Sequence, residues 1–187
     1  MSSQTWWYVA RASGIIAWAL ASLTVIGGLQ LSTRLVRRPA PSWVLDVHRF
    51  LGGLTVAFVA VHMLGLAADQ FIGFGPVELL VPFASSYKPA AVALGVVAMY
   101  LLVAIELSSL AMKKLPRRTW HAVHLTSFAL FVVATVHGIT AGTDRHNAVF
   151  QWACLLTAAL VLMMTLVRIW SPRRLARSKA SVATDAS

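Results

Sequence analysis

Five stretches of the chain are apolar enough and long enough to cross a membrane as helices. They cover residues 7–31, 43–68, 89–112, 120–141 and 148–169, and each exceeds the roughly 20 residues that a span requires. Most charged residues and prolines lie between the stretches rather than inside them. The pattern predicts an all-α integral membrane protein, a bundle of five transmembrane helices, with six as the alternative.

The basic residues indicate how these spans are oriented. Three basic residues, Arg11, Lys88 and Arg145, fall on one side of the predicted membrane, and the other side has 13 of the 16. The positive-inside rule then places the N-terminus outside and the C-terminus in the cytoplasm, as an odd number of spans requires. The 13 are Arg34, Arg37, Arg38, Arg49, Lys113, Lys114, Arg117, Arg118, Arg168, Arg173, Arg174, Arg177 and Lys179.

The composition agrees with a membrane protein. The chain is 58% hydrophobic and 12% charged, whereas a soluble domain has about 25% charged residues. We therefore attribute the net charge of +10 to cytoplasmic loops and not to nucleic-acid binding. Residues 1–170 are expected to form one bundle in contact with membrane lipid, and residues 171–187 a basic, then disordered, cytoplasmic tail. The lone Cys154 excludes a disulfide framework and reads as a buried hydrophobe.

Residues 69–88 form the one long external connection. It is apolar but interrupted by Gly73, Gly75, Pro76 and Pro82, so it is too broken for a span. Two interpretations stay open: an interfacial or re-entrant lid over the outer end of the bundle, and a loop that rests on the membrane surface.

Four histidines lie at two depths in two of the predicted spans. His48 and His62 are 14 residues apart in the second span, and His124 and His137 are 13 apart in the fourth. Each spacing is about 20 Å at 1.5 Å per helical residue. Because both spans enter from the cytoplasm, His48 matches His124 (or His121) in depth, and His62 matches His137. Ionisable side chains inside a membrane are costly and are candidates for function.

The helical faces agree less well than the depths. At 100° per residue His62 lies about 40° from His48, on a stripe that includes the small residue Gly52. The same arithmetic leaves His137 about 140° from His124. Either two cofactors lie on different sides of the fourth span, or that helix is distorted.

The ligand types indicate heme. Two neutral imidazoles from opposed helices suit the axial positions of a heme iron, whereas zinc requires four ligands at one depth. Iron with two axial imidazoles has no open axial position, which favours electron transfer. Arg49, Arg117 and Arg118 lie near the inner pair and could bind heme propionates, although the positive-inside pattern alone would place them there.

Other polar residues leave alternatives open. Glu106 in the third span could accept a hydrogen bond from an inner histidine, pair with a loop Arg or Lys, or belong to a proton path. The competing class of function is therefore a non-redox membrane anchor or a proton-relay protein. His121 is assigned a supporting or interfacial position, His146 a solvated external turn, and Trp120 the aromatic belt.

The histidine pattern resembles that of a known family. Residues 45–144, with spacings of 14 and then 13 two helices later, resemble the ferric reductase-like transmembrane domain family. That family includes the membrane parts of ferric reductases and NADPH oxidases, and the heme-binding membrane subunit that serves periplasmic methionine sulfoxide reductase. The resemblance implies that His48 and His124 ligate an inner b-type heme, and that His62 and His137 ligate an outer one.

The chain departs from the larger members of that family. Their core usually has six helices and continues into a cytoplasmic domain for FAD and a nicotinamide, whereas this sequence has no Gly-rich dinucleotide motif and no motif for flavin. We therefore expect a multi-pass inner-membrane component of an oxidoreductase rather than a complete enzyme. Its electrons would come from a separate flavoprotein or quinol and pass to an acceptor on the outer face, such as a periplasmic or extracellular redox partner.

Overall fold

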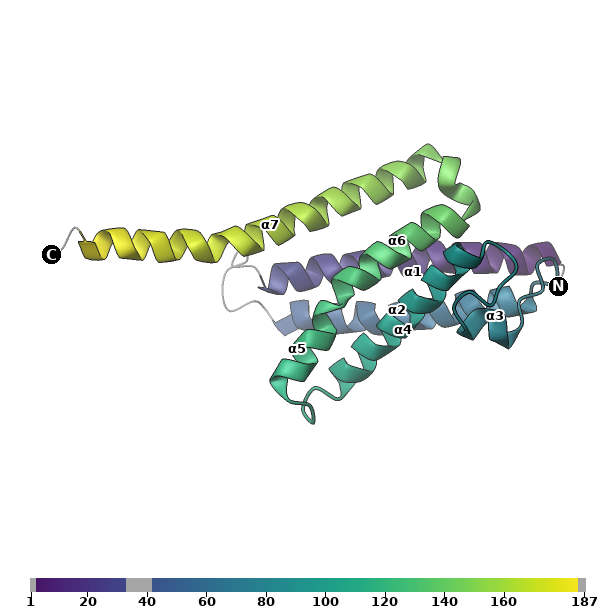
Figure 1. Cartoon of the computed structure of the whole chain (residues 1–187), viewed down its shortest axis with the longest axis horizontal. Helices are drawn as coiled ribbons and strands as arrows, with labels where there is room; N and C mark the ends of the chain where they lie inside the picture. Colours follow the sequence, from purple (N-terminus) through teal and green to yellow (C-terminus); the bar gives the residue numbers. More distant parts are fainter. Residues whose placement is uncertain (1–2, 33–41, 185–187) are drawn as a thin grey trace.

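The computed structural model is an all-helical bundle. It describes the backbone of residues 3–32 and 42–184, and the side chains of residues 4–32 and 42–170; the described residues include no strand. Five helical segments are long and apolar enough to span a membrane, which confirms a multi-pass membrane protein. They are α1 (Ser3–Ser32), α2 (Ser42–Ala68), α4 (Pro89–Leu110), α5 with α6 (Arg117–Leu125 and Ser127–Ala141) and the first part of α7 (Ala148–Thr184) (Figure 1).

Four of the spans surround a central space. The helix α1 packs along α2, and α4 packs along α6, while α1 also contacts α6 and α2 contacts α4 more sparsely. Consequently α2 and α6 occupy opposite corners of the bundle. The fifth span, α7, lies outside these four against α1, and Val25, Phe131 and Val161 join α1, α6 and α7 in one apolar core.

The fourth span is broken in the middle. The helix α5 ends at Leu125 and α6 begins at Ser127, so that Thr126 separates them. Thr126 has a ψ of −7°, and its hydroxyl donates to the carbonyl oxygen of Val123 at 2.6 Å. Of the two explanations for the unequal histidine faces, a distorted helix is therefore the one observed.

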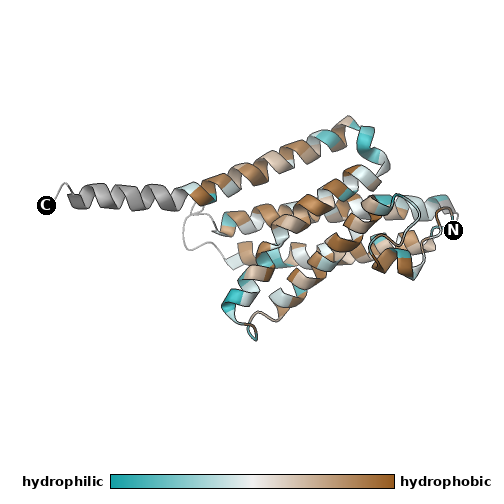
Figure 2. Cartoon of the chain, in the orientation of Figure 1, coloured by the Kyte–Doolittle hydropathy of each residue, from teal (hydrophilic) through white to brown (hydrophobic). Residues whose placement is uncertain are grey.

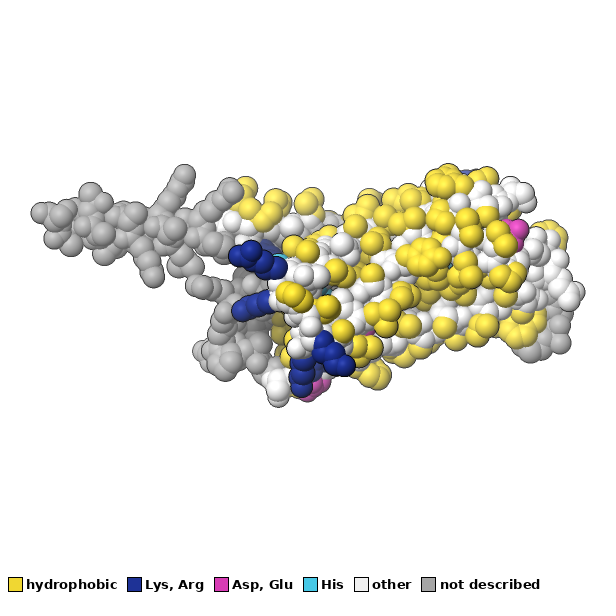
Figure 3. Space-filling view, turned by 60° about the horizontal axis from the view of Figure 1, so that its bottom comes forward, with side chains coloured by type: hydrophobic (Ala, Val, Ile, Leu, Met, Phe, Trp, Pro, Cys, Tyr) yellow, Lys and Arg dark blue, Asp and Glu magenta, His cyan; other side chains and the backbone are white. Residues whose placement is uncertain are grey.

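Polar residues lie at the ends of the bundle. Figure 2 shows hydrophobic residues along the middle of the spans, and Figure 3 shows Lys and Arg side chains gathered where α5 begins. These exposed residues include Lys113, Lys114, Arg117 and Arg118. We call this the basic end; Arg34, Arg37 and Arg38, assigned to the same side, lie outside the described residues.

The helix α7 extends beyond the predicted fifth span. It continues to Thr184, past residue 171, where the sequence predicted a change to a disordered tail. Leu, Ala, Arg and Lys recur in this segment and favour helix. The side chains from residue 171 onward lie outside the described residues, so the assignment of a separate cytoplasmic tail stays a prediction.

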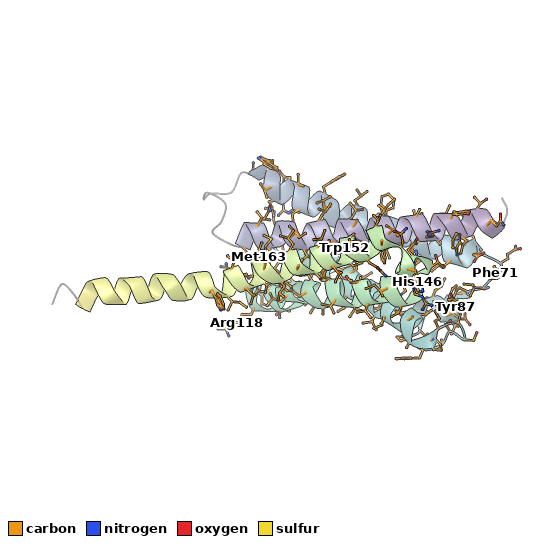
Figure 4. All side chains as sticks on the ribbon, turned by 90° about the horizontal axis from the view of Figure 1, so that it is seen from above. Phe71, Tyr87, Arg118, His146, Trp152 and Met163 are labelled. Atoms are coloured by element: carbon orange, nitrogen blue, oxygen red, sulfur yellow. The ribbon has the colours of Figure 1, made fainter. Side chains whose placement is uncertain are left out.

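The external connection folds over the end opposite to the basic end. It contains the short helix α3 (Pro76–Leu80), and Phe74 is buried beside Tyr87, with ring centroids 6.3 Å apart. Phe71 is 87% exposed and points away from the bundle, at the end opposite to Arg118 (Figure 4). The connection therefore turns some aromatic residues inward and others outward.

Candidate metal centres

The four histidines of the second and fourth spans form two ring pairs. The ring centroids of His48 on α2 and His124 on α5 are 6.1 Å apart, with an angle of 59° between the rings. Those of His62 on α2 and His137 on α6 are 6.5 Å apart, with an angle of 83°. These are the pairs that the spacing predicted. We call them the inner pair, near the basic end, and the outer pair.

The separation within each pair suits one metal ion between two imidazoles. Nitrogen ligands bind a metal at about 2.0 Å, and a ring centre lies about 1.1 Å beyond its nitrogen, so two axial imidazoles have centroids about 6.2 Å apart. Aromatic rings in direct contact have centroids about 4.5–7 Å apart, so the separation alone also fits packed rings. Among the described residues, no three or more His, Cys, Asp or Glu side chains gather around a common point for a metal ion. Each pair thus offers two nitrogens, as the axial positions of a heme require.

Backbone carbonyls orient the outer pair. The Nδ1 atom of His62 lies 2.6 Å from the carbonyl oxygen of Ala10 on α1, and Nδ1 of His137 lies 2.7 Å from that of Ala91 on α4. A carbonyl only accepts, so Nδ1 of each neutral ring is the donor, and Nε2 keeps its lone pair. Metal-binding histidines in proteins commonly have this arrangement.

A glycine follows each of these carbonyls by one helical turn. A methyl group at Gly14 would lie 2.9 Å from Nδ1 of His62, and one at Gly95 would lie 2.6 Å from Cε1 of His137. Both separations are closer than side-chain carbons normally approach. The rings can therefore lie against α1 and α4 only because these positions lack a side chain. We call each carbonyl with its glycine four residues later a carbonyl–glycine seat.

A looser seat of the same kind faces His48. Its Nδ1 is directed toward the backbone of Thr24 but outside hydrogen-bond geometry, and a methyl group at Gly28 would lie 3.2 Å from its Cε1. Ala10 and Thr24 are 14 residues apart, as are His48 and His62. Because α1 and α2 run antiparallel, the two seats on α1 match the two histidines on α2.

His124 differs from the other three histidines. Its Nδ1 is buried without a hydrogen-bond partner, as is Nδ1 of His48, and none of the glycines contacts its ring. Trp120, one turn earlier on α5, stacks on it with ring centroids 5.1 Å apart and an angle of 23°. The inner pair is thus held by other means than the outer pair.

A cavity of about 270 Å³ adjoins the outer pair, close to the lower end of the range of about 300–1,000 Å³ for ligand pockets. His62 and His137 line it, together with Gly14, Gly95 and mostly apolar residues of α1, α2, α4 and α6. The external connection contributes Phe74 and other residues, so it covers the outer end of the cavity. Neither residue of the inner pair lines this cavity.

An ion pair joins α1 to the segment after α6 near the outer end of the cavity. The guanidinium of Arg11 binds both carboxylate oxygens of Asp144 in the short helix η1 (Thr143–His146), and Nε to Oδ2 is 2.6 Å. Arg11 also lies over the ring of Trp7, 5.1 Å from its centroid. Sequence reasoning assigned Arg11 to the outer side but did not predict this pair, because the two residues are 133 positions apart.

Glu106 lies between the levels of the two pairs, nearer the inner one. Its carboxylate faces Gly52, which is one turn from His48 on α2, and a methyl group at Gly52 would collide with Oε1. Among the described residues no hydrogen bond or ion pair to Glu106 occurs, and the inner histidines do not donate to it. Gly52 therefore gives the Glu106 carboxylate room to lie against α2.

The remaining candidates lie outside the ring pairs. His121 is exposed beside Trp120, and His146 is exposed with its Nε2 accepting from Nε of Arg145 at 3.0 Å. Arg49, Arg117 and Arg118 are exposed at the basic end, so their expected contact with heme propionates stays a prediction. Cys154 is buried and unpaired.

Sequence reasoning missed several residues that shape the site. Trp18 lies in the middle of α1, lines the cavity and donates from Nε1 to Oγ1 of Thr135 on α6 at 3.0 Å. A tryptophan far from either membrane interface was a signal for such a contact. The glycines of the seats gave a weaker signal, since small residues are common wherever membrane helices pack.

Most of the chain matches the model of a known family. The family model for the ferric reductase like transmembrane component matches residues 13–135, about two-thirds of the chain. The match includes most of α1, which the resemblance over residues 45–144 left out, and it ends two residues before His137. No curated protein and no solved structure matches the chain.

Proposed function

Because the chain belongs to the ferric reductase-like transmembrane component family, we propose that it is the electron-transfer component of a membrane oxidoreductase and holds two b-type hemes. The observation that carries this proposal is the presence of two histidine ring pairs, at two depths, each with the separation of two axial ligands. A heme held by two histidines would supply one-electron oxidation and reduction, which suits electron transfer rather than chemistry on a substrate.

The residues of the chain have separate roles in this proposal. His48 and His124 would hold the inner heme, and His62 and His137 the outer one. The carbonyls of Ala10 and Ala91 fix the tautomer of the outer ligands, because each accepts the Nδ1 proton and leaves Nε2 for the metal. Arg49, Arg117 and Arg118 at the basic end are the proposed partners of the inner propionates.

The partners of this component follow from its orientation. If the basic end faces the cytoplasm, the inner pair would hold the group that is reduced there, by a separate flavoprotein or by membrane quinol. The outer pair would then hold the group that passes electrons to an acceptor on the opposite side. The cavity beside the outer pair and the external connection that covers it support an approach of that acceptor from outside. Substrate chemistry would then belong to another protein.

A visible difference spectrum tests the proposal. The purified protein, reduced minus oxidised, should show a sharp b-type band. His62→Ala and His137→Ala should each remove the same part of that band, and His48→Ala and His124→Ala the other part. His121→Ala and His146→Ala are matched controls that should retain both parts. A folded but colourless protein after expression with ample heme would refute the proposal.

A non-redox function in proton relay or anchoring is the competing candidate. Glu106, which has no ion pair among the described residues, favours it. In that case Glu106→Gln would abolish proton flux in vesicles and the spectrum would show no heme. Retention of both hemes with no proton flux in the parent protein would exclude it.

A further inference from the structure

A buried hydrogen-bond donor with no acceptor lies beside the inner pair. Nε1 of Trp120 is buried and has no partner, and Nδ1 of His48 and of His124 are in the same condition. An indole N–H only donates. A buried donor without an acceptor is costly and rare, so Nε1 of Trp120 indicates that a polar acceptor is bound here in the working protein.

The position of Trp120 is not explained by the aromatic belt. Tryptophans of the belt direct their N–H toward the water interface, whereas Nε1 of Trp120 is shielded within the protein. Its ring instead lies nearly parallel to that of His124. Carbonyls orient the outer histidines, whereas His124 has no such carbonyl. The stacked indole ring therefore restricts the orientation of the His124 imidazole.

The surroundings identify the chemical class of the missing acceptor. Arg117, Trp120 and His124 stand at positions i, i+3 and i+7 of α5 and therefore share one face of that helix. The face presents a cation, then an N–H donor, then a metal ligand, in that order from the basic end inward. An anionic acceptor is favoured in such a place, because both the N–H and the guanidinium stabilise negative charge. A b-type heme bears two carboxylates at one edge.

We propose that Trp120 is a positioning residue for the inner centre, stacking on His124 and donating from Nε1 to a carboxylate of the cofactor held between His48 and His124. This rests on the proposed function. It assigns Trp120 two tasks that separate variants can distinguish, since Trp120→Phe retains an aromatic ring for stacking but removes the donor. Trp120→Leu removes both.

The test compares heme with its dimethyl ester, which lacks the carboxylates. In a His62→Ala background, which leaves only the inner site, each cofactor is bound to the protein and its loss to excess apomyoglobin is timed. We expect heme to be retained longer than the ester, and Trp120→Phe to reduce that preference about tenfold. Trp120→Leu should also shift the midpoint potential of the inner band. Trp152→Phe, at an exposed position on α7, is the matched control and should change neither.

The outcomes separate this inference from the proposed function. If the parent protein binds no heme, both fail. If it binds heme but Trp120→Phe retains the full preference over the ester, only the role of Trp120 is overturned. Should Trp120→Phe not fold, the indole N–H band of the parent protein in ultraviolet resonance Raman spectra replaces it. That band must differ between the heme and ester forms, and an identical band would overturn the inference.

Discussion

His137 on α6 is held by Ala91 on the neighbouring helix α4, through a separation of 2.7 Å between its Nδ1 and the Ala91 carbonyl oxygen. His62 has the same relationship to Ala10 on α1, and in both cases a glycine lies one turn beyond the carbonyl. The two halves of the outer pair are therefore built alike, although the sequences of α1 and α4 share no evident repeat. The site depends on two backbone surfaces as much as on two histidines.

Gly95→Ala is expected to displace the ring of His137. The added methyl group would lie 2.6 Å from Cε1 of His137. The ring cannot move away without breaking the hydrogen bond of its Nδ1 to the Ala91 carbonyl. The outer part of the b-type band should be lost, so that the ratio of heme to protein falls by about half. Heme content after purification measures this.

The glycines should form a graded series. Gly14→Ala should resemble Gly95→Ala, whereas Gly28→Ala, with 3.2 Å to the His48 ring, should have a weaker effect that is confined to the inner band. Gly53→Ala is the control, because nothing lies within 4 Å of the added methyl group. It should bind heme normally and be slightly stabilised, since alanine favours helix by up to about 1 kcal/mol over glycine. Equal losses of heme at all four positions would contradict the role of the carbonyl–glycine seats.

Gly52 and Glu106 should be coupled in a double-mutant cycle. Gly52→Ala forces the Glu106 carboxylate to move within the membrane, which is expected to destabilise the protein by about 1–3 kcal/mol. In a Glu106→Ala background the added methyl group meets no carboxylate, so the same substitution should cost little. Thermal unfolding in detergent measures all four proteins. Additive effects would show that the two side chains do not meet.

The ion pair between Arg11 and Asp144 should stabilise the outer end modestly. Arg11 is partly exposed, so solvent screens the interaction, although both carboxylate oxygens are engaged. Asp144→Asn and Arg11→Gln are each expected to reduce the free energy of unfolding by about 1 kcal/mol or less. The difference from the parent protein should shrink in high salt. Arg145→Gln, at the adjacent exposed residue, is the control and should have no such salt dependence.

Lys88 is expected to hold the end of the helix that bears His137. Its Nζ donates to the carbonyl oxygens of Thr140 and Ala141, at 3.1 and 3.3 Å, in the last turn of α6. A cation there also interacts favourably with the helix dipole, by about 0.3–1 kcal/mol. Lys88→Met retains the aliphatic chain but should speed amide hydrogen exchange at residues 138–142. Lys88→Arg should keep these amides as protected from exchange as in the parent protein. If the Met and Arg variants exchange alike, the charge at position 88 does not stabilise the end of α6.

The five spans, the basic end and the depths of the histidines could be predicted from the sequence, because each depends on local properties. Hydropathy over a helical window decides whether a segment spans, and 1.5 Å per residue converts a spacing such as that of His48 and His62 into a depth. The same arithmetic failed for the faces of His124 and His137, because it assumed an unbroken helix and Thr126 interrupts it.

What the sequence alone determined, then, was which residues lie at which level of the membrane. The tertiary structure decided which of them meet. Gly14, Gly95 and the carbonyls of Ala10 and Ala91 look unremarkable along the chain, since backbone groups carry no signal in a sequence and glycine is common in membrane helices. They become a site only when α1 packs on α2 and α4 packs on α6, because that packing brings each carbonyl within hydrogen-bond distance of a ring that lies 46 or 52 residues away.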